Sequence, residues 1–415
     1  MMTMRSAIVL GGGMVGVGTA LHLQSRGWSV ALVDRREPGR ETSYGNAGII
    51  QSEAVRPYAM PYDLAGVLDI ALARTNDVHY RLMALPHHVK PLLRYWWNSF
   101  PARHEVLTRT YAQLIARAAP EHEPLIQAAG AGNLVRRDGF RVLHRTQAQF
   151  DKEAKEAEAV GKAFGVKFKL LSASELAKAE PGLTDSGIGG LHWQEPWTVS
   201  DPGSLVTSYA DLFVKRGGKL LVGDATTLAQ QGSGWAVTTQ EGHIEAEAAV
   251  VALGPWSPEF LKRFGMDIPM VRKRGYHRHY SGGAPLDLPL RDAAFGYLMN
   301  PMAKGVRITT GAELSSPDAK PTPVQLGKAE AAARQLIDLG KPVEPEPWIG
   351  TRPCMPDMLP VVGPAARHKG LWLHFGHGHQ GFTLGPATGR ILAELMSGED
   401  ASVDVAACAP ARFGA

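Results

Sequence analysis

The distribution of apolar residues predicts a strand, a helix and a second strand at the start of the chain. Residues 7–10 are all apolar, which is typical of a strand buried on both faces. A glycine-rich turn and a helical stretch follow, and residues 29–33 then alternate as a second strand would. A buried strand that enters a helix through glycines indicates a βαβ nucleotide-binding unit.

The turn and the helix carry the spacing GxGxxGxxxAxxLxxxG, beginning at Gly11. Gly11 allows the sharp turn, Gly13 lets the backbone approach a pyrophosphate, and Gly16 lets helix and strand pack closely. Gly27 is placed to end the helix, where a positive φ is often needed.

The start of this helix and the end of the second strand are the expected nucleotide contacts. Free N–H groups at the helix start, around Met14 and Val15, would bind phosphate. Asp34 would accept a hydrogen bond from a ribose hydroxyl, and Arg35 would lie beside the adenosine or in solvent. This stretch alone leaves FAD and NAD as alternatives.

The middle of the chain predicts helices and then a return to strands. Residues 60–130 are mostly helical in pattern. Within them, residues 87–104 combine tryptophan and leucine with lysine and arginine, for which we expect a core-facing helix with a charged outer edge. Contact of this helix with a membrane surface is the alternative.

Further elements follow from local signals. Glycine, capping or alternation patterns predict a strand at 139–143, a helix at 151–165, a capping box at 172–175, a helix from Asp201 to Val214, strands at 219–222, 235–239, 244–246 and 249–252, antiparallel strands over 271–310, a loop and helix at 315–339, and a linker at 341–347.

Composition narrows the class of protein. The 415 residues suffice for two or three domain-sized units, and the net charge of +4 is small and dispersed, so we expect no nucleic-acid partner. Cys354 and Cys408 form no CxxC pair, which fits a reducing compartment. Because the first apolar run is explained by the nucleotide unit and no other run could span a bilayer, we expect a cytoplasmic protein.

Two later motifs suggest ligand chemistry. Residues 42–48, TSYGNAG, are small and polar, so they would let the backbone approach a flat ligand, with Thr42 and Ser43 donating to phosphate. Arg352 lies in the segment GTRPCMPDMLPVVGP, and its planar guanidinium suits a carboxylate. Cys354 in the same segment is expected to be a small buried thiol.

The last motif is a strand at 371–375, a glycine–histidine turn and a helix expected from Gly385. His374, His377 and His379 lack a thiol or carboxylate companion, so we expect no metal site. A position of His377 or His379 beside the ligand is an open alternative.

Together these motifs resemble the D-amino-acid oxidase superfamily of FAD-dependent flavoproteins, and in particular the bacterial D-amino-acid dehydrogenase branch of the small-subunit type. The resemblance rests on the GxGxxG unit, on TSYGNAG, and on Arg352-Pro353 followed by PDxxPxxG. It implies non-covalent FAD. It also implies an α/β fold, in which a Rossmann-like FAD-binding domain carries an inserted α+β substrate domain built on a mixed, largely antiparallel sheet.

The resemblance also implies domains and site residues. The FAD-binding domain would comprise residues 1–60, 198–267 and 348–415, and the substrate domain residues 61–197 and 268–347. Arg352, Tyr276 and His379 are the expected catalytic residues, with Arg352 holding the substrate carboxylate. The expected cofactor contacts are Gly11, Gly13, Met14, Val15, Gly16, Asp34, Arg35, Thr42, Ser43, Asn46, Ala47, Gly48, Ala225, Gly254, Trp256, Gly378, His379, Gly381 and Thr383.

The implied reaction is oxidative deamination of an amino acid by hydride transfer from Cα to the flavin. The preferred interpretation is a D-amino acid, with D-proline and D-hydroxyproline among the candidates. The alternatives are a glycine or N-methyl amino acid (sarcosine-like) oxidase, an NAD-binding dehydrogenase, and a module that holds FAD without turnover. The electron acceptor (quinone, dye or oxygen), the stereochemistry, the oligomeric state and a peripheral contact with the inner membrane stay open.

Overall fold

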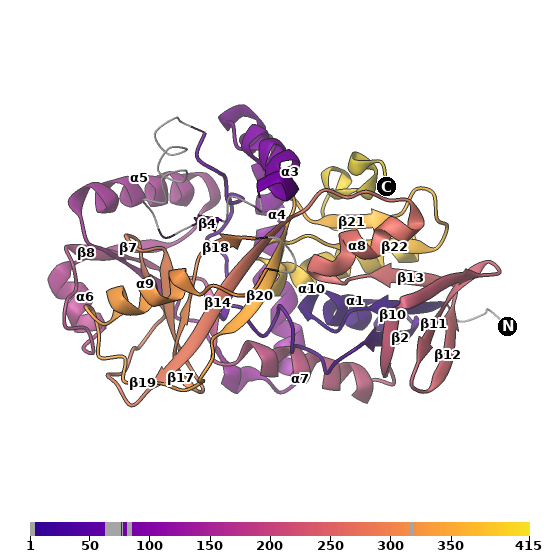
Figure 1. The fold of residues 1–415 in the computed structure, drawn as a ribbon, viewed down its shortest axis with the longest axis horizontal. Coiled ribbons are helices and arrows are strands. Elements are labelled where there is room, and N and C mark those ends of the chain that lie inside the picture. The colour runs from indigo at the N-terminus through magenta and orange to yellow at the C-terminus, as the bar shows by residue number, and fades with distance from the viewer. Residues whose placement is uncertain (1–4, 63–75, 77, 81–84, 316–318) are drawn as a thin grey trace.

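The computed structural model describes residues 5–62, 76, 78–80, 85–315 and 319–415. They form two large sheets side by side, with helices on their outer faces (Figure 1). The expectation of a mostly helical pattern over 60–130 falls partly outside the described residues.

The first sheet contains the predicted βαβ unit. Its order is β12-β11-β10-β2-β1-β13-β22-β21, and β1 pairs in parallel with both β2 and β13. Its strands are β1 (Ser6–Leu10), β2 (Ser29–Asp34), β10 (Lys219–Gln231), β11 (Gly234–Thr239), β12 (Gly242–Ala246), β13 (Ala248–Val251), β21 (Val361–Pro364) and β22 (Leu371–Phe375). β10 is longer than predicted, because beyond its parallel pairing with β2 it continues into a hairpin with β11.

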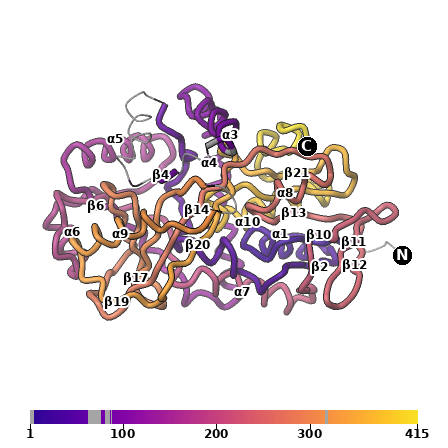
Figure 2. Tube along the Cα trace, in the orientation of Figure 1, coloured from indigo at the N-terminus to yellow at the C-terminus, as the bar shows by residue number. Residues whose placement is uncertain are grey.

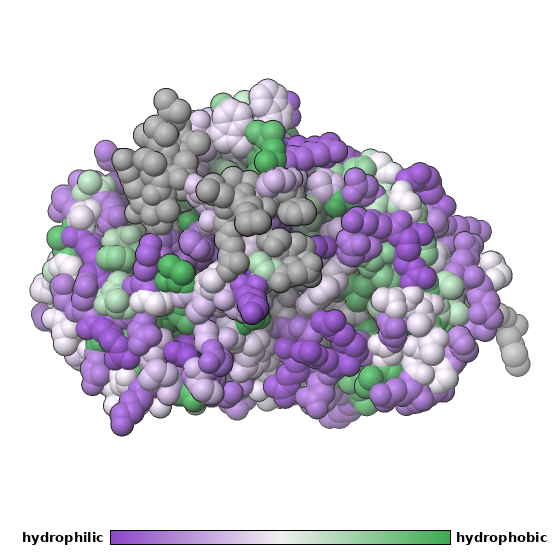
Figure 3. Space-filling model, viewed as in Figure 1, coloured by the Kyte–Doolittle hydropathy of each residue, from purple (hydrophilic) through white to green (hydrophobic). Residues whose placement is uncertain are grey.

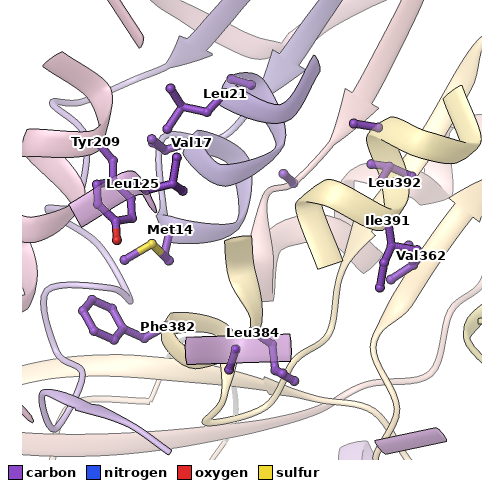
Figure 4. Close-up of a cluster of buried hydrophobic side chains, with 14 of the residues drawn as sticks. Met14, Val17, Leu21, Leu125, Tyr209, Val362, Phe382, Leu384, Ile391 and Leu392 are labelled. Carbon is purple, nitrogen blue, oxygen red and sulfur yellow. The ribbon is translucent and has the colours of Figure 1, made fainter. Parts of the chain in front are cut away.

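Four helices bury one face of this sheet. They are α1 (Met14–Gln24), α4 (Pro101–Ala128), α7 (Pro202–Lys215) and α10 (Gly381–Ser397). Their apolar side chains form one cluster with those of β1, as Figure 4 shows for Met14, Val17 and Ile391. α10 begins at Gly381, four residues before the predicted start, because its first turn is built from the residues that end the glycine–histidine turn.

Glycines bring the backbones of α1 and α10 into contact. A Cβ atom on Gly18 would lie 3.0 Å from the carbonyl oxygen of Gly385, and one on Gly389 would lie 2.8 Å from the backbone nitrogen of Thr19. Neither helix can carry a side chain at these points without moving away from the other. The two helices are therefore held at a close, fixed distance.

The second sheet is mixed and largely antiparallel, as predicted. It is centred on β14, and its parallel pairs are β15 with β6 and β18 with β4. Its strands are β4 (Val78–Tyr80), β6 (Phe140–His144), β7 (Phe168–Ser172), β8 (Gly189–Trp193), β14 (Val271–Ser281), β15 (Leu290–Asp292), β16 (Tyr297–Met302), β17 (Gly305–Thr309), β18 (Ala312–Leu314), β19 (Lys341–Pro342) and β20 (Trp348–Cys354). The predicted linker at 341–347 thus begins as β19.

The remaining elements are short or peripheral. A small sheet joins β3 (Ile49–Ile50), β9 (Trp197–Val199) and β5 (Val135–Arg136). Among the described residues, the other α-helices are α3 (Leu85–Asn98), α5 (Gln147–Phe164), α6 (Ala173–Ala179), α8 (Ser257–Leu261) and α9 (Val324–Ala333). Single 3-10 turns lie at Gly132–Leu134, Gly254–Trp256, Lys262–Phe264, Ala406–Cys408 and Pro410–Phe413.

The predicted caps are confirmed. Ser172 and Glu175 form both hydrogen bonds of a capping box at the start of α6. The Asp201 side chain accepts from the Ser204 N–H at the start of α7, and Gly165 ends α5 with φ 74°. These signals were readable because each depends only on residues within one turn.

Helix α3 departs from the expectation of a core-facing helix. Tyr95 is buried, but Val89, Leu93 and Trp97 are 46%, 59% and 53% exposed. Figure 3 shows apolar surface, in green, among hydrophilic atoms where Figure 1 labels α3. The helix therefore contacts the protein through a narrow strip and presents apolar side chains outward.

Strands β14 and β20 run between the two halves of the molecule (Figure 2). The strands of residues 1–60 and 198–267 lie in the first sheet or in the small third sheet, and most strands of the two predicted substrate segments lie in the second. β20, however, pairs with β14 in the second sheet although it belongs to the last predicted FAD-binding segment. The division into five segments stays a prediction.

We predict that Gly389→Ala destabilises the protein by about 1–3 kcal/mol, because the new methyl group meets the backbone of α1. Urea-induced unfolding would measure this change. The control is Gly327→Ala in α9, where a Cβ meets nothing within 4 Å and higher helix propensity should stabilise by up to about 1 kcal/mol. Equal effects of the two substitutions would contradict the close helix contact.

Candidate active site

A cavity of about 1150 Å³ extends between the two sheets. Pockets for small molecules usually occupy roughly 300–1,000 Å³, so this cavity is large enough for an extended ligand. At one end it is lined by Gly11, Asp34 and Ala225, and at the other by Lys273 and Arg352. The two ends have different chemistry.

The first end is suited to a nucleotide. The N-terminus of α1 lines the cavity, but its Met14 N–H donates to the Ser43 hydroxyl at 3.0 Å and is therefore not a free donor as the sequence led us to expect. Asp34 accepts from the Gly12 N–H at 2.6 Å, which holds the carboxylate at the cavity wall. The Arg35 guanidinium lies 4.8 Å from the centre of the Trp256 ring.

The loop at 42–48 is held in place by the second sheet. The Arg307 guanidinium donates to the carbonyl oxygens of Tyr44 and Asn46 at 3.0 and 2.8 Å, and Asn300 donates to that of Ala47 at 2.6 Å. Burial lowers the pKa of Arg307 to about 10. Arg307 therefore positions this loop.

The glycine–histidine turn is tied to both central helices. His374 contacts the hydroxyls of Thr19 on α1 and Thr388 on α10 at 2.7 and 2.8 Å, and His377 contacts Thr388 at 2.9 Å. Burial lowers the pKa of His374 well below its ordinary value and that of His377 to about 3. Both histidines are therefore neutral parts of a buried network.

The second end of the cavity carries Arg352. Its guanidinium donates to the carbonyl oxygens of Thr310 and Gly311, each at 2.8 Å. Arginine has five N–H donors, so others remain for a ligand. The Arg352 side chain also lies over Gly275, where a Cβ atom would be 2.8 Å from Nη2. Glycine at 275 therefore leaves space for the guanidinium.

Two further groups surround Arg352. The Lys273 ammonium lies 4.3 Å from the centre of the Tyr95 ring, and burial lowers the pKa of Lys273. His379 is exposed to solvent on one side, and desolvation of its ring by the surrounding residues, followed by the charges of Arg352 and Lys273, lowers its pKa, so this imidazole is neutral at pH 7. The Tyr58 ring lies edge-on to His379 at 5.9 Å.

Tyr276 lines the cavity, but its hydroxyl is already engaged. It donates to the Glu313 carboxylate and accepts from the Thr322 N–H at 2.9 Å. Burial and the hydrogen bond to Glu313 raise the pKa of Tyr276 to about 12. A catalytic role for Tyr276 stays a prediction, and these contacts favour a structural role.

Glu53 is a cavity residue that the sequence did not reveal. It is 9% exposed, it accepts from the Gln51 amide, and its Oε2 atom has no hydrogen-bond partner among the described residues. Burial raises the pKa of Glu53 to about 7. Gln51 in turn accepts from Gln380, the residue before α10, at 2.6 Å. No local motif marks Glu53, because its burial results from tertiary packing.

Most of the predicted cofactor contacts line the cavity. Gly16, Gly48 and Thr383 do not: Gly16 packs on Gly11, Gly48 packs on Val199, and the Thr383 hydroxyl donates to Ile49 O. The cavity residues that were predicted are Gly11, Gly13, Met14, Val15, Asp34, Arg35, Thr42, Ser43, Asn46, Ala47, Ala225, Gly254, Trp256, Tyr276, Arg352, Gly378, His379 and Gly381.

Cys354 also lines the cavity and is half-buried, so the expectation of a simple buried thiol is incomplete. Within the described part of the chain, no group of three or more His, Cys, Asp or Glu residues could hold a metal ion. No helix among the described residues is long and apolar enough to cross a membrane.

The cavity fits FAD. The N-terminus of α1 and its glycine-rich turn line the cavity where a pyrophosphate would approach, and Asp34 lines it at the end of β2, where it would accept from a ribose hydroxyl. Opposite them, the start of α10 points its first turn at the cavity through Gly381 and Phe382. A helix N-terminus there would stabilise negative charge on a reduced flavin ring.

Comparison with known proteins defines the class. Residues 6–395 match the family of FAD dependent oxidoreductases (DAO). The chain therefore belongs to this family of flavin-dependent oxidoreductases, with FAD as its cofactor, and the resemblance drawn from the sequence is confirmed. This finding favours FAD over the NAD alternative.

Individual relatives narrow the comparison. The chain is 31% identical over 99% of its length to a D-amino-acid oxidase of Bradyrhizobium diazoefficiens, and 99% of that protein is covered. It is 29% identical to a D-amino acid dehydrogenase of Chromohalobacter salexigens, over 98% of this chain and 99% of the relative. Glycine oxidase from Geobacillus kaustophilus shares the fold with a TM-score of 0.72 at 20% identity, each chain being 98% covered.

The buried histidines predict acid lability. The pKa of His122, His374 and His377 lies below the unfolded value of about 6.5, so only the unfolded state takes up protons as the pH falls below that value. Each should cost about 1.4 kcal/mol of stability at pH 5.5. The free energy of unfolding, measured by urea at pH 7.5 and 5.5, should therefore fall, and a flat profile would contradict this.

Glu53 acts in the opposite direction. Its pKa is raised to about 7, so its neutral form stabilises the folded state increasingly as the pH falls from 7 toward 4.5. Glu53→Gln should therefore steepen the loss of stability on acidification.

Proposed function

We propose that the protein oxidises D-amino acids at the bond between Cα and nitrogen. The observation that carries this proposal is the Arg352 guanidinium, held by two carbonyl oxygens at the end of the cavity away from the nucleotide site. A rigid guanidinium there would bind an α-carboxylate with paired, charge-assisted hydrogen bonds. The relatives named D-amino-acid oxidase and D-amino acid dehydrogenase support the choice of D-amino acids.

The surrounding residues have separate tasks in this proposal. Arg352 orients Cα, and His379 and Tyr58, whose rings are in edge-to-face contact, line the same part of the cavity. Bound FAD supplies the two-electron acceptor for the hydride from Cα. The substrate amine must lose a proton before oxidation, and Glu53 is a buried carboxylate in the same cavity that would accept it. The imine product then hydrolyses to a 2-oxo acid, or stays cyclic for a proline-like substrate.

The first test is anaerobic reduction of the purified yellow holoenzyme by D-, L- and N-methyl amino acids. Bleaching of the flavin band by D-amino acids alone is expected. Bleaching by glycine and sarcosine alone would favour the glycine or N-methyl amino acid alternative, and no bleaching by any member of the panel would contradict the proposal. Admission of oxygen, a quinone or a dye afterwards identifies the electron acceptor.

Arg352→Leu should raise KM for D-amino acids at least about 30-fold, because truncating one partner of a buried charge pair costs about 2–5 kcal/mol. FAD should stay bound, because the nucleotide end is unchanged. The control is Arg367→Leu, which also removes an arginine bound to two carbonyl oxygens, those of Gly265 and Gly414, but outside the cavity. Unchanged kinetics in Arg352→Leu would overturn the carboxylate assignment.

The rate of flavin reduction at low substrate should rise through about pH 7, as Glu53 becomes ionised. Glu53→Gln should remove this limb and leave only the later rise caused by the substrate amine. Stopped-flow reduction between pH 5.5 and 10 measures both. An identical profile in wild type and Glu53→Gln would show that Glu53 is not the proton acceptor.

The outward face of α3 supports a peripheral contact between the protein and a membrane that holds the electron acceptor. Its exposed Val89, Leu93 and Trp97 lie on a helix with Lys90 and Arg94, a combination suited to an anionic lipid surface. Its buried Tyr95 lines the cavity from the same helix. A membrane acceptor docked at α3 would therefore lie close to the substrate end.

A further inference from the structure

We propose that Lys273 is a second carboxylate-binding residue, so that the preferred substrates are amino acids with an acidic side chain, such as D-aspartate or D-glutamate. This inference rests on the proposed function and names its substrate class.

Lys273 and Arg352 face the same part of the cavity. They are directly opposite each other in the antiparallel pairing of β14 with β20. Side chains of directly opposed residues leave a sheet on the same face, with Cβ atoms about 4.5–5.5 Å apart. Both residues line the cavity. Two cations are therefore placed side by side at its substrate end.

No carboxylate neutralises this pair among the described residues. Arg352 donates to backbone carbonyls, and the described Lys273 contact is with the Tyr95 ring. The titratable groups that act on Lys273 are Cys354, Tyr58 and Arg352, and none of them is a carboxyl group. Lys273 and Arg352 are half-buried, and both line the cavity. An enclosed charge without a partner is costly.

A single α-carboxylate would neutralise only one of these cations. A substrate with a second carboxylate would neutralise both, and the separation of neighbouring strand positions suits two carboxylates joined by a short carbon chain. The Tyr95 ring holds the ammonium by a cation–π contact without neutralising it. Tyr95 in turn donates its hydroxyl to the Tyr58 carbonyl, so the lysine is positioned before any substrate binds.

The experiment compares matched substrates in wild type and Lys273→Met. Anaerobic flavin reduction is measured with D-glutamate and D-glutamine, which differ in charge but hardly in size. In the wild type, D-glutamate should reduce the flavin at least about 30-fold more efficiently than D-glutamine does, as expected for a buried charge pair. Lys273→Met should lose this preference and change the D-glutamine efficiency less than about threefold. D-aspartate with D-asparagine repeats the comparison at a shorter spacing.

Lys167→Met is the control, because Lys167 is an exposed lysine paired with Glu195 outside the cavity. This substitution should leave the efficiency of flavin reduction by both substrates unchanged. An equal loss for D-glutamate and D-glutamine in Lys273→Met would overturn the inference while leaving the proposed function intact, since Lys273 would then bind the α-carboxylate or the flavin. If neither D-amino acid reduced the wild-type flavin, that result would reject the proposed function as well.

Binding without turnover gives a second readout, which also applies if Lys273→Met does not fold. Wild-type holoenzyme is titrated calorimetrically with succinate and butyrate, which lack an amine and cannot be oxidised at Cα–N. Succinate should bind at least about tenfold more tightly than butyrate, and the difference should disappear in Lys273→Met. Equal affinity of wild type for the two would overturn the second carboxylate site.

Discussion

The close contact between α1 and α10 is the constraint on which the site depends. Gly18, Gly385 and Gly389 let the two backbones touch, and the buried hydrogen bonds of His374 with Thr19 and Thr388 fix their relative position. Because of this contact, the N-termini of both helices reach the same cavity. One helix end would serve a pyrophosphate and the other a ring that becomes negatively charged, so a single packing contact would set the distance between the two electrostatic sites.

The second sheet completes the site by supplying positive charge. β14 and β20 bring Lys273 and Arg352 to the cavity, and β16 and β17 bring Asn300 and Arg307 to the 42–48 loop. Arg307 and Arg352 are both held by backbone carbonyl oxygens, yet they differ in role: Arg307 lies in the protein interior at 2% exposure, whereas Arg352 lines the cavity. Both side chains leave the sheet on the same face, because their β14 partners, His279 and Lys273, are six positions apart, so the distinction comes from where along β14 each arginine lies.

The sequence predicted the fold class and much of the nucleotide end, and less of the substrate end. Gly11, Asp34 and Ser43 were found because the motifs that contain them are local. Tyr276 was an expected catalytic residue, but the alternation of residues along a strand could not show that its hydroxyl binds Glu313. Helix α3 was expected to face the core, but several of its apolar side chains are exposed. Amphipathic composition does not reveal how much of a helix is covered by its neighbours.

The sequence by itself determined the FAD-binding unit, the caps and the family, because glycine spacing, capping and the Arg352-Pro353 motif act within a few residues. Only the tertiary structure decided which charges meet in the cavity. Lys273 lies beside Arg352 through the register of β14 and β20, and Glu53 is buried by segments distant in the chain. Register and burial depend on contacts between remote segments, so no local pattern specifies them.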